Sequence, residues 1–150
     1  MERIKEIIIK QFPTAQAVQG KQYLEISVEN SHLLELCKFL KENSETSFDY
    51  LFRESAVDFL THFTMVYHLE SIKHRHQIVV KSNIIDRVKP EISSVYSIWK
   101  GADLHEREIF DLFGIEFTNH PDMRKIFLDN DWVGFPMRKD YVDEVNIVER

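Results

Sequence analysis

The regular spacing of apolar residues stops at Gly114, whereas apolar and aromatic residues continue to the end of the chain. Before this glycine, apolar side chains recur at the intervals typical of helices and strands. After it, only residues 115–117 have a short strand-like pattern, yet the composition is too aromatic for a solvated tail. The sequence therefore predicts a compact domain over residues 1–114 and an extended C-terminal arm over residues 115–150.

The arm needs an apolar surface to cover its large side chains. Long loops without secondary structure are rare inside compact domains, and those that occur are usually disordered or functional. The arm is expected either to lie on another protein or to wrap around its own domain, and the residue pattern leaves both possibilities open. Its large apolar residues are Phe117, Met123, Ile126, Phe127, Trp132, Phe135, Met137 and Tyr141.

The first third of the chain is expected to form two helices separated by a strand. Apolar spacing predicts a helix over residues 4–12, which ends at Pro13. Alternation of apolar and polar residues predicts a half-buried strand over residues 21–28. Ser31 is a candidate N-cap of the second helix, whose apolar stripe would place Cys37 in the core.

The central part of the chain is expected to form hairpins. Residues 48–52 alternate, residues 53–55 can turn, and residues 57–69 are rich in β-branched and aromatic side chains. Polar residues 71–74 then lead to a further strand over residues 75–81. Sequential hairpins predict an α+β fold, in which helices pack on a mostly antiparallel sheet.

Asp103 begins the best-defined helix of the sequence, and Gly114 is expected to end it. Glu106 is placed for a capping-box contact. Arg107 and Asp111 lie four residues apart, so an ion pair of about 0.3–0.5 kcal/mol is expected at the surface. No nucleophile or base motif is adjacent, and we interpret the acidic residues as a salt-bridged helix face.

Charge and hydropathy exclude two classes of function. The formal net charge of −6 opposes binding to a phosphate backbone, so nucleic acid is not an expected partner. No apolar run approaches the roughly 20 residues that span a bilayer. Charged residues within Met1–Glu6 stand where a signal peptide needs an apolar core. The chain is expected on the cytoplasmic side, in contact with a membrane only through a partner.

No cofactor site is expected within this chain. Cys37 is the only cysteine, which excludes an internal disulfide and a self-contained iron–sulfur cluster, because such a cluster typically needs about four thiolates. His62, His68, His74 and His76 lie close together, but no carboxylate or thiol ligand pattern accompanies them. The sequence has no glycine-rich phosphate loop, so direct binding of NAD or a nucleotide has no support.

Two polar segments stand out in the arm, at residues 120–125 and 134–140. In the second segment, Arg138 and Asp140 are interleaved with aromatic residues and with prolines that favour an extended backbone. This combination is typical of a strand that recognises another protein. An exposed charged loop is the alternative.

Three motifs occur in order, namely ADLHEREIFDLFGI over residues 102–115, HPDMRKI over 120–126 and GFPMRKDY over 134–141. Together they resemble the thirty-kilodalton subunit family of respiratory complex I, and shorter similarities at residues 57–59, 67–69 and 94–95 extend the resemblance over most of the chain. The departures from the family pattern are Asp103, Leu104, Phe135 and Val142, where Asn, Trp, His and Pro are usual.

The resemblance implies a free-standing bacterial scaffold subunit in the hydrophilic arm of NADH-quinone oxidoreductase. Its partners would be the quinone-site large subunit, of D type, and the iron–sulfur subunits, of B and I types. Partner subunits would bind flavin, iron–sulfur clusters, NADH and quinone, and this chain would bind no cofactor. The whole complex would transfer electrons from NADH to quinone, coupled to proton translocation, at the cytoplasmic side of the bacterial inner membrane.

Two other functions stay open at this point. The chain could be the equivalent subunit of a membrane-bound hydrogenase or of a dehydrogenase complex with another electron donor. A histidine-dependent metalloenzyme is a hypothesis from a different class. Under the resemblance, no residue is catalytic, and the residues expected at subunit interfaces are Glu106, Arg107, Glu108, Asp111, Gly114, His120, Pro121, Arg124, Trp132, Pro136, Arg138, Lys139, Asp140 and Tyr141.

Overall fold

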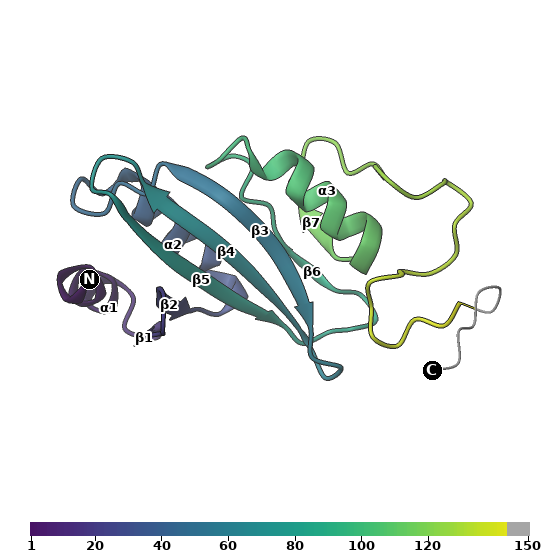
Figure 1. Ribbon diagram of the computed structural model, residues 1–150, viewed down its shortest axis with the longest axis horizontal. Coiled ribbons are helices and arrows are strands. Elements are labelled where there is room, and N and C mark those ends of the chain that lie inside the picture. The colour runs from purple at the N-terminus through teal and green to yellow at the C-terminus, as the bar shows by residue number, and fades with distance from the viewer. Residues whose placement is uncertain (144–150) are drawn as a thin grey trace.

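The computed structural model describes residues 1–143 and has a five-stranded sheet, a two-stranded sheet and three helices in that range (Figure 1). The predicted α+β class is confirmed. The elements are α1 Glu2–Gln11, β1 Gln16–Gln19, β2 Leu24–Ser27, α2 Asn30–Glu42, β3 Tyr50–Asp58, β4 Phe63–Ser71, β5 His76–Ile84, β6 Glu91–Ser93, α3 Ala102–Phe113 and β7 Glu116–Thr118.

The larger sheet has the strand order β1-β2-β5-β4-β3. The hairpin strands β3, β4 and β5 are antiparallel to one another, as predicted, whereas β2 runs parallel to β5. The smaller sheet is a parallel pair, β6 and β7. The predictions did not include β1 or β6, because strands of three or four residues are too short to show a clear alternation.

Helices α1 and α2 form one layer of the domain, and α2 lies behind the long hairpin strands in the view of Figure 1. The predicted stripe of α2 is buried, and Cys37 is fully inaccessible to solvent. The rings of Phe12 and Phe39 meet edge to face at 5.6 Å, which joins the end of α1 to α2. The prediction that Ser31 is an N-cap was wrong, because α2 begins at Asn30 and Ser31 lies within its first turn.

The predicted turn at residues 53–55 was also wrong. Strand β3 continues through this segment, with only a shift in pairing around Phe52. The chain reverses at residues 59–62 instead, where Leu60 has a φ of 67°. The carboxylate of Asp58 accepts a hydrogen bond of 2.7 Å from the Leu60 backbone N–H, which stabilises the turn locally.

Helix α3 ends at Gly114 as predicted, and the glycine has a left-handed conformation with a φ of 70°. A Cβ atom at this position would lie 2.5 Å from the aromatic ring of Phe135 in the arm. Two properties of glycine are therefore needed here: its freedom at positive φ and its lack of a side chain. The glycine allows the arm to pass close to the end of α3.

Replacing Gly114 with alanine is expected to lower the free energy of unfolding by about 2–3 kcal/mol, because the substitution adds left-handed strain and a clash with Phe135. Denaturant unfolding of the whole chain measures this loss. Gly101→Ala is the matched control, since a Cβ at Gly101 meets nothing nearer than 3.9 Å. An equal loss in both variants would contradict the close approach of the arm.

Within residues 1–143, no helix is both long enough and apolar enough to cross a membrane.

Candidate subunit-interface site

The arm after β7 returns along α3, so that residues of the three motifs lie near one another (Figure 1). Contacts from two carboxylates of the domain, Asp111 and Asp58, hold the arm in place. We call these two residues the arm anchors. Both are buried, with exposed fractions of 1% and 3%.

The first arm anchor, Asp111, binds the middle of the arm. Its Oδ2 accepts hydrogen bonds from three consecutive backbone N–H groups, those of Ile126, Phe127 and Leu128, at 3.1, 2.7 and 3.0 Å. Burial acts to raise the pKa of this carboxyl, but the three N–H donors outweigh burial and the pKa lies below its ordinary value. Asp111 is therefore a charged acceptor that fixes the backbone of the arm.

The expected ion pair between Arg107 and Asp111 is absent, and that prediction was wrong. Arg107 instead donates a hydrogen bond of 3.1 Å from Nε to the backbone carbonyl of Arg124. Arg124 itself pairs with Asp122 two residues away. Backbone donors in the arm compete for Asp111 more effectively than a flexible guanidinium, because three of them converge on one oxygen.

The second arm anchor, Asp58, binds the end of the arm. Its carboxylate accepts hydrogen bonds from Arg87, at 2.5 and 3.2 Å, and from the backbone N–H of Lys139, at 2.9 Å. The hydrogen bonds from Arg87 hold the pKa of this carboxyl well below its usual range. Arg87 also pairs with Asp140 at 3.3 Å.

Arg138 lies over the C-terminal end of α3. Its Nε donates a hydrogen bond of 2.6 Å to the carbonyl of Phe113, one of the carbonyls that a helix end leaves unpaired. Its guanidinium lies 5.1 Å from the ring centre of Phe63 and 4.7 Å from that of Phe135. Within the described residues, Arg138 therefore binds its own chain, and a contact with a partner stays a prediction.

Glu106 is fully buried, and the predicted capping contact was wrong. Its carboxylate accepts hydrogen bonds from Ser94 Oγ at 2.6 Å and from the Val95 backbone N–H at 2.7 Å. Burial raises the pKa of Glu106 to about 7. The interpretation of the acidic residues as a salt-bridged surface was wrong for Glu106 and Asp111, because both side chains point into the protein.

His120 is buried beside Glu106. Its Nε2 lies 3.3 Å from Asp103 Oδ1 and 3.7 Å from Glu106 Oε2, and its Nδ1 accepts a hydrogen bond of 3.0 Å from the Asp122 backbone N–H. An acceptor role for Nδ1 requires the ring proton on Nε2. The histidine therefore joins the start of the arm to α3.

The motif residues divide into two groups. Buried contacts within the chain involve Glu106, Asp111, Gly114, His120 and Arg138. The rest have wholly or partly exposed side chains, namely Arg107, Glu108, Pro121, Arg124, Trp132, Pro136, Lys139, Asp140 and Tyr141.

Asp58 and Arg87 were missed as site residues. The family resemblance included residues 57–59 but assigned them no role. Nothing in the sequence marks their contacts with Lys139 and Asp140, because 81 residues separate Asp58 from Lys139.

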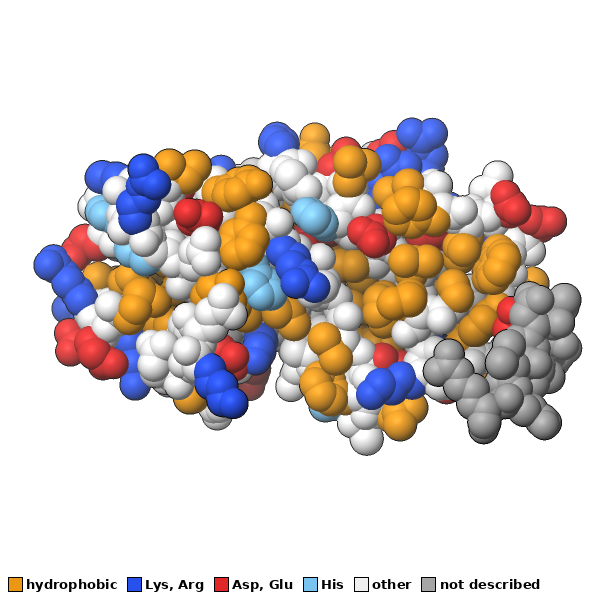
Figure 2. Space-filling model, in the orientation of Figure 1, with side chains coloured by type: hydrophobic (Ala, Val, Ile, Leu, Met, Phe, Trp, Pro, Cys, Tyr) orange, Lys and Arg blue, Asp and Glu red, His pale blue; other side chains and the backbone are white. Residues whose placement is uncertain are grey.

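Large apolar side chains point outward from the arm. Figure 2 shows hydrophobic side chains gathered over the part of the molecule formed by α3 and the arm. A folded monomer rarely exposes such a group of residues without a binding partner. The exposed fractions are 62% for Leu104, 37% for Ile126, 64% for Phe127, 41% for Trp132, 86% for Val133, 55% for Met137 and 71% for Val142.

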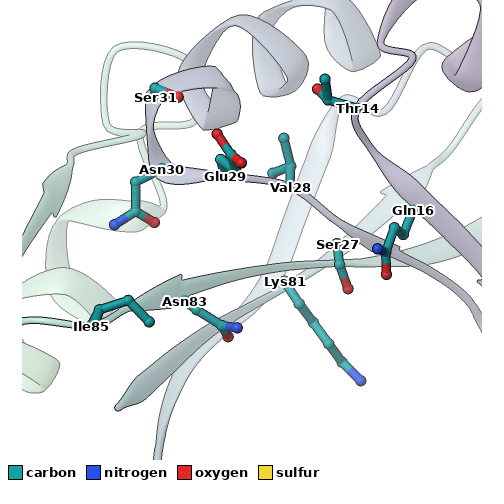
Figure 3. Close-up of a pocket in the computed structure, with 10 residues that line it drawn as sticks. All are labelled: Thr14, Gln16, Ser27, Val28, Glu29, Asn30, Ser31, Lys81, Asn83 and Ile85. Atoms are coloured by element: carbon teal, nitrogen blue, oxygen red, sulfur yellow. The ribbon is translucent and has the colours of Figure 1, made fainter.

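A groove of about 700 Å³ lies between the start of α2 and the end of β5 (Figure 3). Two of its polar side chains already have partners: Lys81 pairs with Glu25 at 2.5 Å, and Asn83 accepts a hydrogen bond from Thr64. No ligand is assigned to it. The groove is lined by Thr14, Gln16, Ser27, Val28, Glu29, Asn30, Ser31, Lys81, Asn83 and Ile85.

Residues 1–143 contain no group of three or more His, Cys, Asp and Glu side chains with the geometry of a metal site. His74 and His76 stack with ring centres 5.4 Å apart. Their Nε2 atoms face backbone carbonyls, those of Ser44 at 2.9 Å and Thr46 at 3.4 Å. These two histidines contact the loop after α2.

Comparisons with a family model and with related sequences agree on one protein family. Residues 26–145 match the family described as the 30 Kd subunit of respiratory-chain NADH dehydrogenase. The C-type subunit of NADH-quinone oxidoreductase from Roseiflexus castenholzii is 38% identical over 78% of this chain and 68% of the relative, and that from Geobacter sulfurreducens is 37% identical over 77% and 72%.

The C/D-type subunit of the same enzyme from Phocaeicola vulgatus is 54% identical over 55% of this chain, and the match spans 16% of that relative's length. Among solved structures, a chain of the membrane-bound sulfane sulfur reductase, an archaeal respiratory membrane complex, superposes with a TM-score of 0.77 over 96% of this chain and 86% of that one. At 24% identity, this likeness shows a shared fold. From the family match and the C-type relatives together, the chain belongs to the 30-kDa subunit family of respiratory-chain NADH dehydrogenase.

Proposed function

We propose that this chain is a scaffold subunit of the hydrophilic arm of NADH-quinone oxidoreductase, without catalytic residues of its own. In this proposal its C-terminal arm docks on the quinone-site large subunit. The observation that supports it best is the two-sided construction of the arm. Buried groups of the domain hold its backbone, while several large apolar side chains point outward.

The construction suits docking for a physical reason. A segment that is disordered before binding loses conformational entropy when it binds, which weakens the association. The two arm anchors, Asp58 and Asp111, fix the backbone before any partner is present. Ordered Trp132 and Phe127 side chains can then contribute apolar contacts at a smaller entropic cost.

The relatives support the choice of partner. Several have the combined designation C/D, and a single chain that includes both parts implies that the C part works beside the D part. Iron–sulfur subunits of the B and I types are the further proposed partners. Partner subunits would bind flavin, iron–sulfur clusters, NADH and quinone. The chain would associate with the bacterial inner membrane peripherally, on the cytoplasmic side. Electron transfer through the complex would be coupled to proton translocation.

A complex with a different electron donor is the second candidate. The shared fold with a chain of a sulfane sulfur reductase complex favours it, since this fold occurs outside NADH oxidation. Purifying the assembly with the full chain as bait distinguishes the two. We expect a D-type subunit, bound flavin and NADH-driven quinone reduction. An assembly that lacks flavin and does not oxidise NADH would instead indicate a complex with a different electron donor.

The double substitution Phe127→Ala and Trp132→Ala is expected to leave the isolated chain folded and to reduce the recovered assembly at least about tenfold, since central aromatic residues often contribute about 2 kcal/mol or more to an interface. Quantitative mass spectrometry of the purified assembly measures the loss. Ile72→Ala is the control, because Ile72 is 57% exposed on a hairpin turn away from the arm. Full assembly of the double variant would contradict docking through the arm.

A further inference from the structure

The interior of the domain contains a carboxyl group without a hydrogen-bond partner. Glu54, in the middle of β3, is 5% exposed, and both of its carboxyl oxygens are buried and unpaired. The strand register places it directly opposite Tyr67 of β4, whose buried hydroxyl is also unpaired. Folded proteins leave few buried polar side chains unpaired, so this pair needs a physical explanation.

Three titratable groups from neighbouring elements interact electrostatically with Glu54. They are Cys37 from α2, Tyr67 from β4 and Glu106 from α3. None of the three is a cation, and no ion pair involves Glu54 within residues 1–143. His120 lies on the other side of Glu106, with its Nε2 3.7 Å from Glu106 Oε2.

The two buried glutamates differ in their surroundings. Glu106 accepts hydrogen bonds from Ser94 and from the backbone of Val95, which stabilise a negative charge. Glu54 receives no such donors. An unpaired carboxylate in an apolar interior is far less favourable than the neutral acid. Two adjacent carboxylates would add mutual repulsion to this cost.

We infer that Glu54 and Glu106 form a buried two-carboxyl site between β3 and α3, in which Glu54 keeps a proton at neutral pH and releases it to solvent only when α3 loosens from the sheet. The site makes the fold sensitive to alkaline pH. This behaviour belongs to the chain itself and does not depend on its assembly with other subunits.

Electrostatics agree with the geometry. Burial raises the pKa of Glu54 well above its ordinary value, and the neighbouring Glu106 raises it further. A carboxyl whose pKa is raised on folding binds more protons in the folded state than in the unfolded state. Stability therefore falls as pH rises above the ordinary carboxyl pKa, and continues to fall until the pKa of the folded state is reached.

The test compares melting temperatures of the full chain between about pH 7 and about pH 9. In this range Glu106, whose pKa is about 7, contributes little to the change of melting temperature with pH, which we call the alkaline slope. The wild-type melting temperature is expected to fall across this range. Glu54→Gln and Glu54→Met, which cannot ionise, should lose most of that fall. Glu54→Met should also melt about 5 °C or more above the wild type at the alkaline end. Glu108→Gln, at an exposed site on α3, should keep the wild-type slope.

Infrared spectroscopy supplies a second measurement that reports the proton directly. The wild-type chain at about pH 8, where most of Glu106 is ionised because its pKa is about 7, should show the carbonyl band of a protonated carboxylic acid, and both Glu54 variants should largely lack it. The inference is overturned if the variants keep the wild-type alkaline slope. It is equally overturned if the wild type shows no protonated carboxyl band, a result that stands even when neither variant folds.

Discussion

Replacing Asp58 with alanine is expected to lower the free energy of unfolding by about 3–5 kcal/mol, the loss typical when one partner of a buried ion pair is removed. Arg87, whose side chain is only 18% exposed, would lose its main counter-charge. The backbone N–H groups of Leu60 and Lys139 would lose their acceptor as well. Denaturant unfolding of the full chain gives the size of the effect, and circular dichroism shows whether the variant folds.

Asp140→Ala is the matched control for this substitution. Asp140 also pairs with Arg87, but its side chain is 58% exposed and the contact is 3.3 Å long. Exposed ion pairs contribute at most about 1 kcal/mol. Similar losses from the two substitutions would show that the turn and the arm do not depend on Asp58.

The Asp58 carboxylate also makes the stability of the fold depend on pH in the acidic range. Its pKa lies well below the ordinary value of 3.8, mainly through the hydrogen bonds from Arg87. A carboxyl whose pKa is lowered on folding makes its full contribution to stability at pH values above its ordinary pKa. This contribution is lost as the pH falls from the ordinary pKa toward the lowered pKa of the folded state. The difference in stability between the wild type and Asp58→Ala should therefore narrow below about pH 4.

Replacing Asp111 with alanine is expected to free the middle of the arm and to abolish most assembly into the complex. Three backbone N–H groups would lose one shared acceptor, at a cost of about 1–3 kcal/mol. The arm is partly exposed, so water can replace the acceptor and the rest of the domain should stay folded. Hydrogen exchange at residues 126–128 should accelerate at least about tenfold, since about 1.4 kcal/mol corresponds to a factor of ten.

Glu108→Ala is the control for the arm, because Glu108 lies on the exposed side of the same helix. It should leave hydrogen exchange in the arm unchanged. If Asp111→Ala kept wild-type protection at residues 126–128, the carboxylate would not be what orders the arm. If protection were lost but assembly were complete, a pre-ordered arm would be unnecessary for docking.

Local patterns predicted those elements whose stability depends on neighbours in the sequence. The helix from Ala102 to Phe113 and its end at Gly114 follow from apolar spacing and from the conformational freedom of glycine. The stripe that includes Cys37 was predicted for the same reason. The turn was misplaced because residues 53–55 are polar, and polarity was interpreted as exposure although Glu54 is buried.

The motifs identified the family and the residues that matter, but they did not show what those residues contact. Asp111 lies at the position where a surface ion pair with Arg107 was expected, and it binds the backbone of residues 126–128 instead. Its charge and its helix position were predictable. Its partners were not, because no periodic pattern relates a helix to an irregular arm 15–17 residues later.

The amino-acid sequence was sufficient for the α+β class, for the best-defined helix and for membership of the family, because each depends on residues close together in the chain. Only the tertiary structure decided where the arm lies. The sequence left open whether the arm covers its own domain or another protein, and residues 126–140 bind α3 and Asp58 of the same chain. The reason is physical: a buried carboxylate binds whichever donors the fold brings to it, and the backbone N–H of Lys139 reaches Asp58 across 81 residues of sequence.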